Sequence, residues 1–270
     1  MHLPWQPSLT RCRLVHMLAL GVYWSGFLKD MLCLPRPLSP PMTRITMSGS
    51  AALEYGFPST HSTNAVSVAV YFLHQLHTSP DDFSSTSRLA FLCLGYVYAV
   101  SIILGRMYCG MHGFFDVIVG TIIGLAFAVL QLAFGEPFDE WVASGSWVNP
   151  MIVVFFLLLA VRFHPEPADN CPCYDDSVSF AGVMVGIEVA HWHFATTSYT
   201  DPNGPPGTVY FSLEQLGWVK TILRIVGGIV IVFLWRAAMK PILLRYLPPI
   251  FRIVEKVGWT LPRRFFTRAR

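Results

Sequence analysis

The sequence predicts an all-α, multi-spanning transmembrane helical bundle. Hydrophobic residues make up 53% of the 270 residues and charged residues only 13%, about half the ~25% usual in soluble domains. Mean hydropathy is +0.49. Apolar runs long enough to cross a bilayer follow one another, and backbone groups in lipid must be satisfied within helices or closed barrels. So few charges cannot cover a soluble fold, which excludes soluble globular enzymes and disordered chains.

The apolar runs place the elements along the chain, and we expect about seven or eight spans. The predicted spans are 12–28, 61–77, 88–105, 113–134, 147–163, 178–195 and 218–238. The first run follows Arg11 and Arg13 without a cleavage site after it, so we interpret it as a retained helix rather than a signal peptide. Residues 241–259 are apolar but contain four charged side chains, which is typical of an interfacial helix.

Helix alternation predicts which polar residues share a membrane face. The end of the first helix and the start of the second lie on one face, together with the end of the third and the start of the fourth. Unusual polar residues occur at those positions, namely Lys29, Arg36, 58–61, Arg106 and His112. Ionisable groups at membrane depth are costly, so their convergence on one face indicates a functional site.

Two of these patterns are suited to binding an anion. Arg36 offers a planar fork of donors for phosphate oxygens and Lys29 offers a point charge, although alone they would be ordinary cations at a helix end. Ser59 or Thr60 predicts a helix N-cap. The free N–H groups of such a helix start favour an anion, toward which His61 in the first turn would point.

The third pattern is Arg106, His112 and Asp116. The histidine and the aspartate are four residues apart, so we expect them on one face of a helix. The carboxylate would then hold one imidazole nitrogen and leave the other free as a nucleophile. Alone this would be a structural pair, but the three patterns together indicate displacement at phosphorus, with no carboxylate cluster to suggest a metal.

The motifs K-x6-R-P, P-S-x-H and R-x5-H-x3-D, in this order, resemble those of the type 2 phosphatidic acid phosphatase superfamily. PSTH, with CGMHGFFDV after it, is most similar to the sphingosine-1-phosphate phosphatases of the endoplasmic reticulum. The resemblance implies that His112 attacks phosphorus, Asp116 orients it, and His61 protonates the leaving alkoxide. It also implies phosphate binding by Lys29, Arg36, Ser59, Thr60 and Arg106.

The resemblance further implies a metal-independent phosphomonoester hydrolase without cofactors, acting on sphingoid base 1-phosphates in the endoplasmic reticulum membrane. Alternatives are a polyprenyl phosphate or glucose 6-phosphate phosphatase of the same fold, or a silent truncated isoform that binds lipid phosphate. Thr60 and Gly105 depart from the common Gly and Ser of the family. Family members usually carry two more helices before the first motif, so we expect an N-terminally short form.

These expectations give a domain division and a set of partners. Residues 1–134 would form the phosphatase core in the first four helices, 135–240 further helices of the same membrane domain, and 241–270 a basic C-terminal segment. The partners would be a lipid phosphate substrate and membrane lipid, whereas a net charge of +3 is too weak to suggest nucleic acid. Protein partners are not indicated. Arg11 and Arg13 favour a cytoplasmic N-terminus and a lumenal site.

Overall fold

The computed structural model describes residues 7–46, 53–78, 84–169, 171–197, 200, 207–208 and 213–258, and all regular structure among them is helical. The seven helices are α1 (Pro7–Leu32), α2 (Thr60–Thr78), α3 (Ser85–Tyr108), α4 (Phe114–Ala143), α5 (Val148–Phe163), α6 (Cys173–Ala195) and α7 (Leu213–Lys256). Each predicted span falls on one of these helices, which confirms the all-α class.

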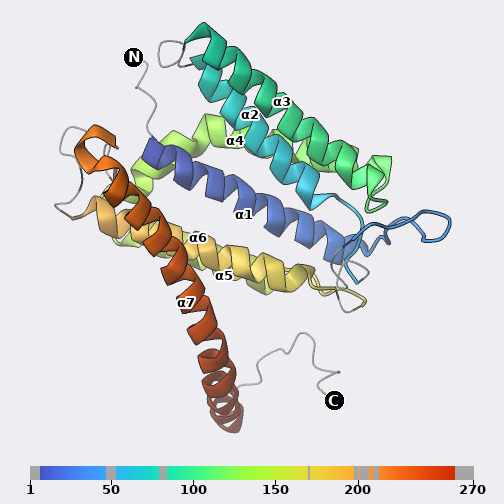
Figure 1. Cartoon of the computed structure of the whole chain (residues 1–270). Helices are drawn as coiled ribbons and strands as arrows, with labels where there is room; N and C mark the ends of the chain where they lie inside the picture. The colour runs from blue at the N-terminus through green and yellow to red at the C-terminus, as the bar shows by residue number, and fades with distance from the viewer. Residues whose placement is uncertain are drawn as a thin grey trace. The chain divides into compact units, whose positions relative to one another are not determined.

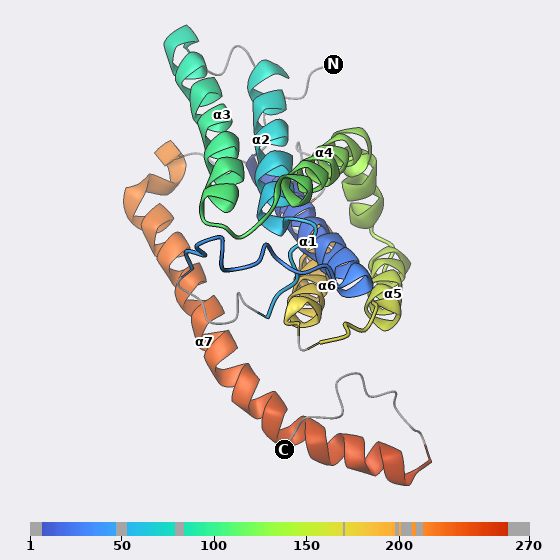
Figure 2. The ribbon, with the colours of Figure 1, turned by 90° about the vertical axis from the view of Figure 1, so that its right-hand side faces the viewer.

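The chain forms two compact units, residues 1–210 and 211–270. In the first unit, α1 packs against α2, α4 and α6, while α2 also contacts α3 and α4, and α5 packs on α6. Figure 1 and Figure 2 show α1 between α6 on one side and the α2 and α4 pair on the other. Helix α1 is therefore the central element of this unit.

Two glycines bring α4 against the start of α2. A Cβ atom on Gly120 would lie 2.6 Å from the carbonyl oxygen of Ser59, and one on Gly124 would lie 2.3 Å from that of Thr63. The Thr63 hydroxyl also donates a hydrogen bond of 3.0 Å to the Gly120 carbonyl. Because no side chain separates the two backbones, α4 fixes the position of the first turn of α2.

A buried ion pair and a buried histidine–carboxylate contact connect α1 to its neighbours near its beginning. Arg13 Nε donates to Asp139 Oδ2 of α4 at 2.7 Å. His16 Nε2 lies 2.8 Å from Glu188 Oε1 of α6. Charged groups inside a membrane bundle are usually paired in this way because an unpaired charge there is costly. These contacts join the N-terminal half of α1, remote from Lys29, to α4 and α6.

Four described helices are long and apolar enough to cross a membrane, namely α3, α4, α6 and residues 216–256 of α7, which indicates a multi-pass membrane protein. Helix α5 is apolar but has only 16 residues. The other two predicted spans correspond to α1 and α2, which carry buried polar side chains such as Ser25, Lys29 and Thr63. These side chains face the bundle and lower the hydropathy of α1 and α2.

Two helices continue past the positions at which the sequence suggested a division. Helix α4 runs through 134 and Pro137 to Ala143, and α7 runs through Pro241 to Lys256. Both domain boundaries, at 134 and 240, therefore lie within helices, and 241–256 is not a separate segment. Proline removes one backbone donor, but membrane helices tolerate it where other groups or a local adjustment of the helix satisfy the freed carbonyl. The basic residues from 263 onward lie outside the described part.

Candidate active site

The predicted site residues converge at one end of the first unit. Lys29 is in the last turn of α1, Arg106 in the last turn of α3, and Asp116 in the first turn of α4. The remaining residues come from the α1–α2 connection, the start of α2 and the α3–α4 connection: Arg36, Ser59, Thr60, His61 and His112. The alternation of helix direction thus predicts this convergence correctly.

His112 is buried in the connection before α4, and a main-chain carbonyl holds its ring. Its Nδ1 lies 2.8 Å from the oxygen of Gly56, whereas the nearer carboxylate oxygen of Asp116 is 3.7 Å away. A carbonyl only accepts hydrogen bonds, so the neutral ring carries its proton on Nδ1 and has a lone pair on Nε2. The nucleophile-like nitrogen is therefore Nε2.

The predicted arrangement of Asp116 with His112 is wrong in one respect. We expected both side chains on one helix face, but α4 begins at Phe114, so His112 precedes the helix. The Asp116 carboxylate instead accepts the Gly113 N–H at 2.8 Å and caps the start of α4. It remains close enough to His112 to act on the ring through its charge.

Gly56, whose carbonyl holds the His112 ring, is a contact residue that sequence reasoning missed. Its N–H donates to the Leu34 carbonyl at 2.9 Å, and a Cβ atom here would lie 2.9 Å from the carbonyl oxygen of Pro35. A side chain at this position would push the backbone away from the segment that carries Arg36. The only sequence signal was a glycine two residues before the P-S-x-H motif.

Two guanidinium groups face Nε2 of His112. Arg36 Nη1 lies 3.2 Å from this nitrogen and also donates to the Met111 carbonyl at 2.9 Å. Arg106 Nη2 lies 3.4 Å from the same nitrogen. A phosphate in front of Nε2 would therefore meet donors from both arginines, which is the geometry that charge-assisted binding requires.

Burial and nearby charge keep the His112 imidazole neutral. Burial lowers the pKa of His112, and the positive charges of Arg36, Lys29 and Arg106 lower it further, while Asp116 acts in the opposite direction. The net direction is downward from the ordinary value, so the neutral, nucleophilic form dominates at neutral pH.

Glu54 is a second residue that the motifs did not reveal. Its carboxylate accepts hydrogen bonds from Lys29 Nζ and, at 2.7 Å, from Arg36 Nη2. Burial opposes ionisation, but the charges of Lys29 and Arg36 outweigh it and hold the pKa of Glu54 at about 2. An ionised carboxylate is thus already paired with the two cations that were predicted to bind phosphate.

The start of α2 agrees with the predicted cap. Ser59 Oγ accepts the N–H of Ser62 at 3.3 Å, and the Ser59 N–H donates to the carbonyl of Asp116 at 3.0 Å. Thr60 Oγ1 accepts a hydrogen bond of 2.8 Å from Ser25 of α1. The helix start is therefore tied to α1 and α4, next to His112.

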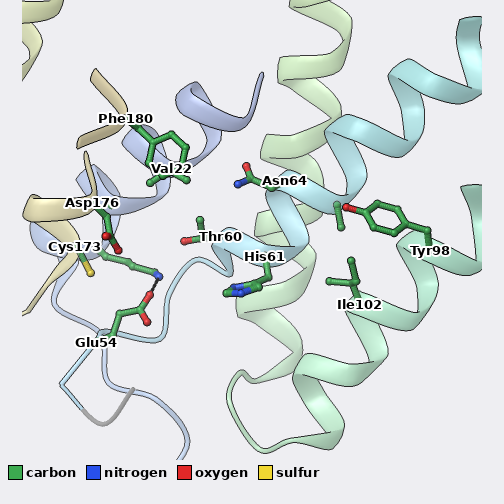
Figure 3. A pocket seen from close by; sticks show the side chains of 13 residues that line it. Val22, Glu54, Thr60, His61, Asn64, Tyr98, Ile102, Cys173, Asp176 and Phe180 are labelled. Carbon is green, nitrogen blue, oxygen red and sulfur yellow. Dashed lines mark hydrogen bonds and ion pairs between the residues drawn. The ribbon is translucent and has the colours of Figure 1, made fainter. Parts of the chain in front are cut away.

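A cavity of about 360 Å³ adjoins these residues, between α1, α2, α3 and α6. Figure 3 shows Glu54 and His61 along its lower side, with Val22 and Phe180 above them. Tyr98 and Ile102 line the α3 side. The cavity thus combines a charged side with apolar walls, which suits an amphiphile.

Fold and site together define a helical membrane domain that can bind an anion against a neutral histidine. Residues 11–137 match the PAP2 superfamily. This match agrees with the resemblance drawn from the three motifs.

Several curated proteins are similar to the chain. A dihydrosphingosine 1-phosphate phosphatase of Schizosaccharomyces pombe is 41% identical over 88% of this chain and 56% of its own length. Another of that name from Saccharomyces cerevisiae is 36% identical over 68% of this chain and 45% of its own. Human sphingosine-1-phosphate phosphatase 2 is 28% identical over 93% of this chain and 61% of its own length. The chain spans about half the length of the first of these relatives. No solved structure matches it significantly.

Proposed function

We propose that this chain is an integral-membrane lipid phosphatase that hydrolyses sphingoid base 1-phosphates, such as sphingosine 1-phosphate and dihydrosphingosine 1-phosphate, to the free base and phosphate. The observation that carries the proposal is the neutral His112, with Nδ1 on the Gly56 carbonyl and Nε2 facing Arg36 and Arg106. The superfamily match supports the reaction, and the names of the relatives support the substrate class.

In the proposed reaction, His112 Nε2 attacks phosphorus and forms a phosphorus–nitrogen bond as the phosphorus–oxygen bond of the ester breaks. His61 gives a proton to the departing alkoxide, which leaves as the alcohol. His61 then takes a proton from water, whose oxygen attacks phosphorus and releases inorganic phosphate from His112. Lys29, Arg36 and Arg106 neutralise the phosphate oxygens in both steps.

The start of α2 and the start of α4 complete the proposed site. Main-chain N–H groups near Ser59 and Thr60 would bind a phosphate oxygen at the positive end of the helix dipole. Asp116 fixes the connection that carries His112 and offsets the positive charge that develops on the ring during attack. These roles need no metal, in keeping with the expectation from the family.

We propose that the site faces the lumen of the endoplasmic reticulum. A lumenal site follows from a cytoplasmic N-terminus with Arg11 and Arg13 and from the odd number of crossings that separates it from the end of α1.

The test is phosphate release from sphingosine 1-phosphate in EDTA by the purified wild type and its His112→Ala variant. We expect metal-independent release that falls at least ~1,000-fold in the variant, the scale seen when a nucleophile is removed. His74→Ala, which removes an exposed histidine of α2, is the matched control and should retain activity.

Three results would contradict the proposal. Release that survives in His112→Ala would reject the nucleophile. Faster release from polyprenyl phosphate or glucose 6-phosphate would reject the substrate class. No release from a folded wild type that binds the lipid would favour the silent, phosphate-binding alternative.

A further inference from the structure

We propose that Glu54 recognises the ammonium group of the substrate, and so selects phosphoesters that carry a positive charge beside the phosphate. The inference rests on the proposed function, because it assigns a specificity residue to that same site. Its starting point is a conflict of charge: the cations expected to hold phosphate already hold a carboxylate.

The conflict is visible in the contacts of Glu54. One of its oxygens accepts from Lys29 and the other from Arg36, whose Nε also donates to the Glu54 carbonyl at 3.0 Å. The carboxylate side chain is 29% exposed, so water screens its charge only in part. An incoming phosphate must share Lys29 and Arg36 with this negative charge or displace it.

A sphingoid base 1-phosphate resolves the conflict by its own chemistry. Its ammonium group is on the carbon next to the phosphoester carbon. As the phosphate oxygens take the donors of Lys29 and Arg36, the ammonium replaces those donors as the partner of Glu54. The charges then alternate across the site, and no ionised group loses its partner.

A phosphoester without the ammonium meets a different environment. Its phosphate would leave Glu54 with a full negative charge, a reduced share of Lys29 and Arg36, and no replacement. Discrimination of this kind comes from repulsion against the wrong ligand as much as from attraction to the right one. Acylation of the amine removes the positive charge with the rest of the molecule nearly unchanged, so the amide is the critical comparison.

The cavity places further groups suitably for this substrate. Asp176 of α6 also lines it, so that a second carboxylate is present on the side of Glu54, as Figure 3 shows. Val22 and Phe180 form an apolar wall beyond these carboxylates. The ammonium would therefore lie near Glu54 and Asp176, with the hydrocarbon chain directed along the apolar wall.

The experiment compares kcat/KM for sphingosine 1-phosphate with that for N-acetylsphingosine 1-phosphate in micelles of a neutral detergent. The wild type should prefer the amine. In Glu54→Gln the amine-to-amide ratio should fall roughly tenfold to hundredfold, as expected for removing one partner of a half-buried charge pair. Glu54→Asp should restore part of the preference, and Glu136→Gln, an exposed residue of α4, should leave it unchanged.

Equal losses on both lipids in Glu54→Gln would overturn the inference, because a purely structural role predicts them. Equilibrium binding of the two lipids to His112→Asn, with and without Glu54→Gln, separates this result from failure of the proposed reaction. If the wild type releases no phosphate, a binding preference for the amine that Glu54→Gln removes still supports recognition by Glu54. Equal binding of amine and amide overturns it.

Discussion

His112 has two ring nitrogens in opposite environments. Nδ1 meets an acceptor, the Gly56 carbonyl, and Nε2 meets the guanidinium groups of Arg36 and Arg106. The other neutral tautomer, protonated on Nε2, would place the Nδ1 lone pair against the Gly56 carbonyl oxygen, which is repulsive. The tautomer is thus fixed by the main chain on one side and by cations on the other.

The charge environment of His112 gives the first prediction. Burial and the neighbouring cations lower the pKa of His112. The ring should therefore stay neutral at pH values somewhat below ~6.5, the ordinary pKa of histidine. Diethyl pyrocarbonate acylates only neutral imidazole. The rate of acylation at His112, measured against pH by peptide mass spectrometry, should have its midpoint at a lower pH than the rate for free N-acetylhistidine. A midpoint at or above that of free N-acetylhistidine would mean that the effect of Asp116 on the pKa of His112 outweighs burial and the cations.

Motif spacing predicts most of the site, but it does not reach every residue. Lys29, Arg36 and His112 stand at fixed distances from helix ends, so helix alternation is enough to bring them together. Gly56 and Glu54 lie in a connection without periodicity, and their roles depend on the path of its backbone. Local chain path, rather than residue type, decides these contacts.

At the scale of helices, the contact between α2 and α4 positions the end of α2 that is proposed to bind phosphate. Gly120 and Gly124 allow the α4 backbone to approach the carbonyl oxygens of Ser59 and Thr63. Small residues commonly permit such close packing in membrane bundles, where van der Waals contact contributes much of the association.

Gly124→Ala provides the second prediction. Its Cβ atom would lie 2.3 Å from the Thr63 carbonyl oxygen, a backbone atom that cannot move alone. We expect destabilisation by about 1–3 kcal/mol, seen as a lower Tm in detergent, and a loss of activity as α2 shifts. Gly182→Ala in α6, where nothing lies within 4 Å, is the control. Equal Tm values for the two variants would contradict the close contact.

Helix positions were predictable because apolar runs are long, but helix ends were not. The apolar run of α7 predicts an end near 238, whereas the helix continues to Lys256. Charged side chains such as Arg245 and Arg252 reduce hydropathy without breaking backbone hydrogen bonds. Composition therefore predicts which segments can lie in lipid, whereas backbone geometry decides where the helix ends.

At the scale of the whole molecule, the ends of α1 and α3 meet the starts of α2, α4 and α6 on one face. The contribution of α6 was not predicted, yet its Cys173 and Asp176 line the cavity. Helix direction alone gives α6 the same polarity as α2 and α4. The proposed function places this face, which carries the site, on the lumenal side of the membrane.

The third prediction concerns that sidedness. Pro41→Asn creates a glycosylation acceptor with Met42 and Thr43 in the α1–α2 connection, where Pro41 is exposed. Asp82→Asn creates a matched acceptor with Phe83 and Ser84 between α2 and α3. A lumenal site predicts a glycan, removable by endoglycosidase, on the first variant only. A glycan on the second variant only would place the site in the cytoplasm.

The ion pairs near the beginning of α1 have a consequence for substrate access. Arg13 and Lys29 are separated by about 24 Å along the helix, close to the ~30 Å of a hydrocarbon core. Arg13 is bound to Asp139 at one end and Lys29 to Glu54 at the other. Helix α1 therefore cannot slide or rotate without breaking an ion pair. In the proposed function, this anchoring would set the depth in the bilayer at which a lipid substrate presents its phosphate.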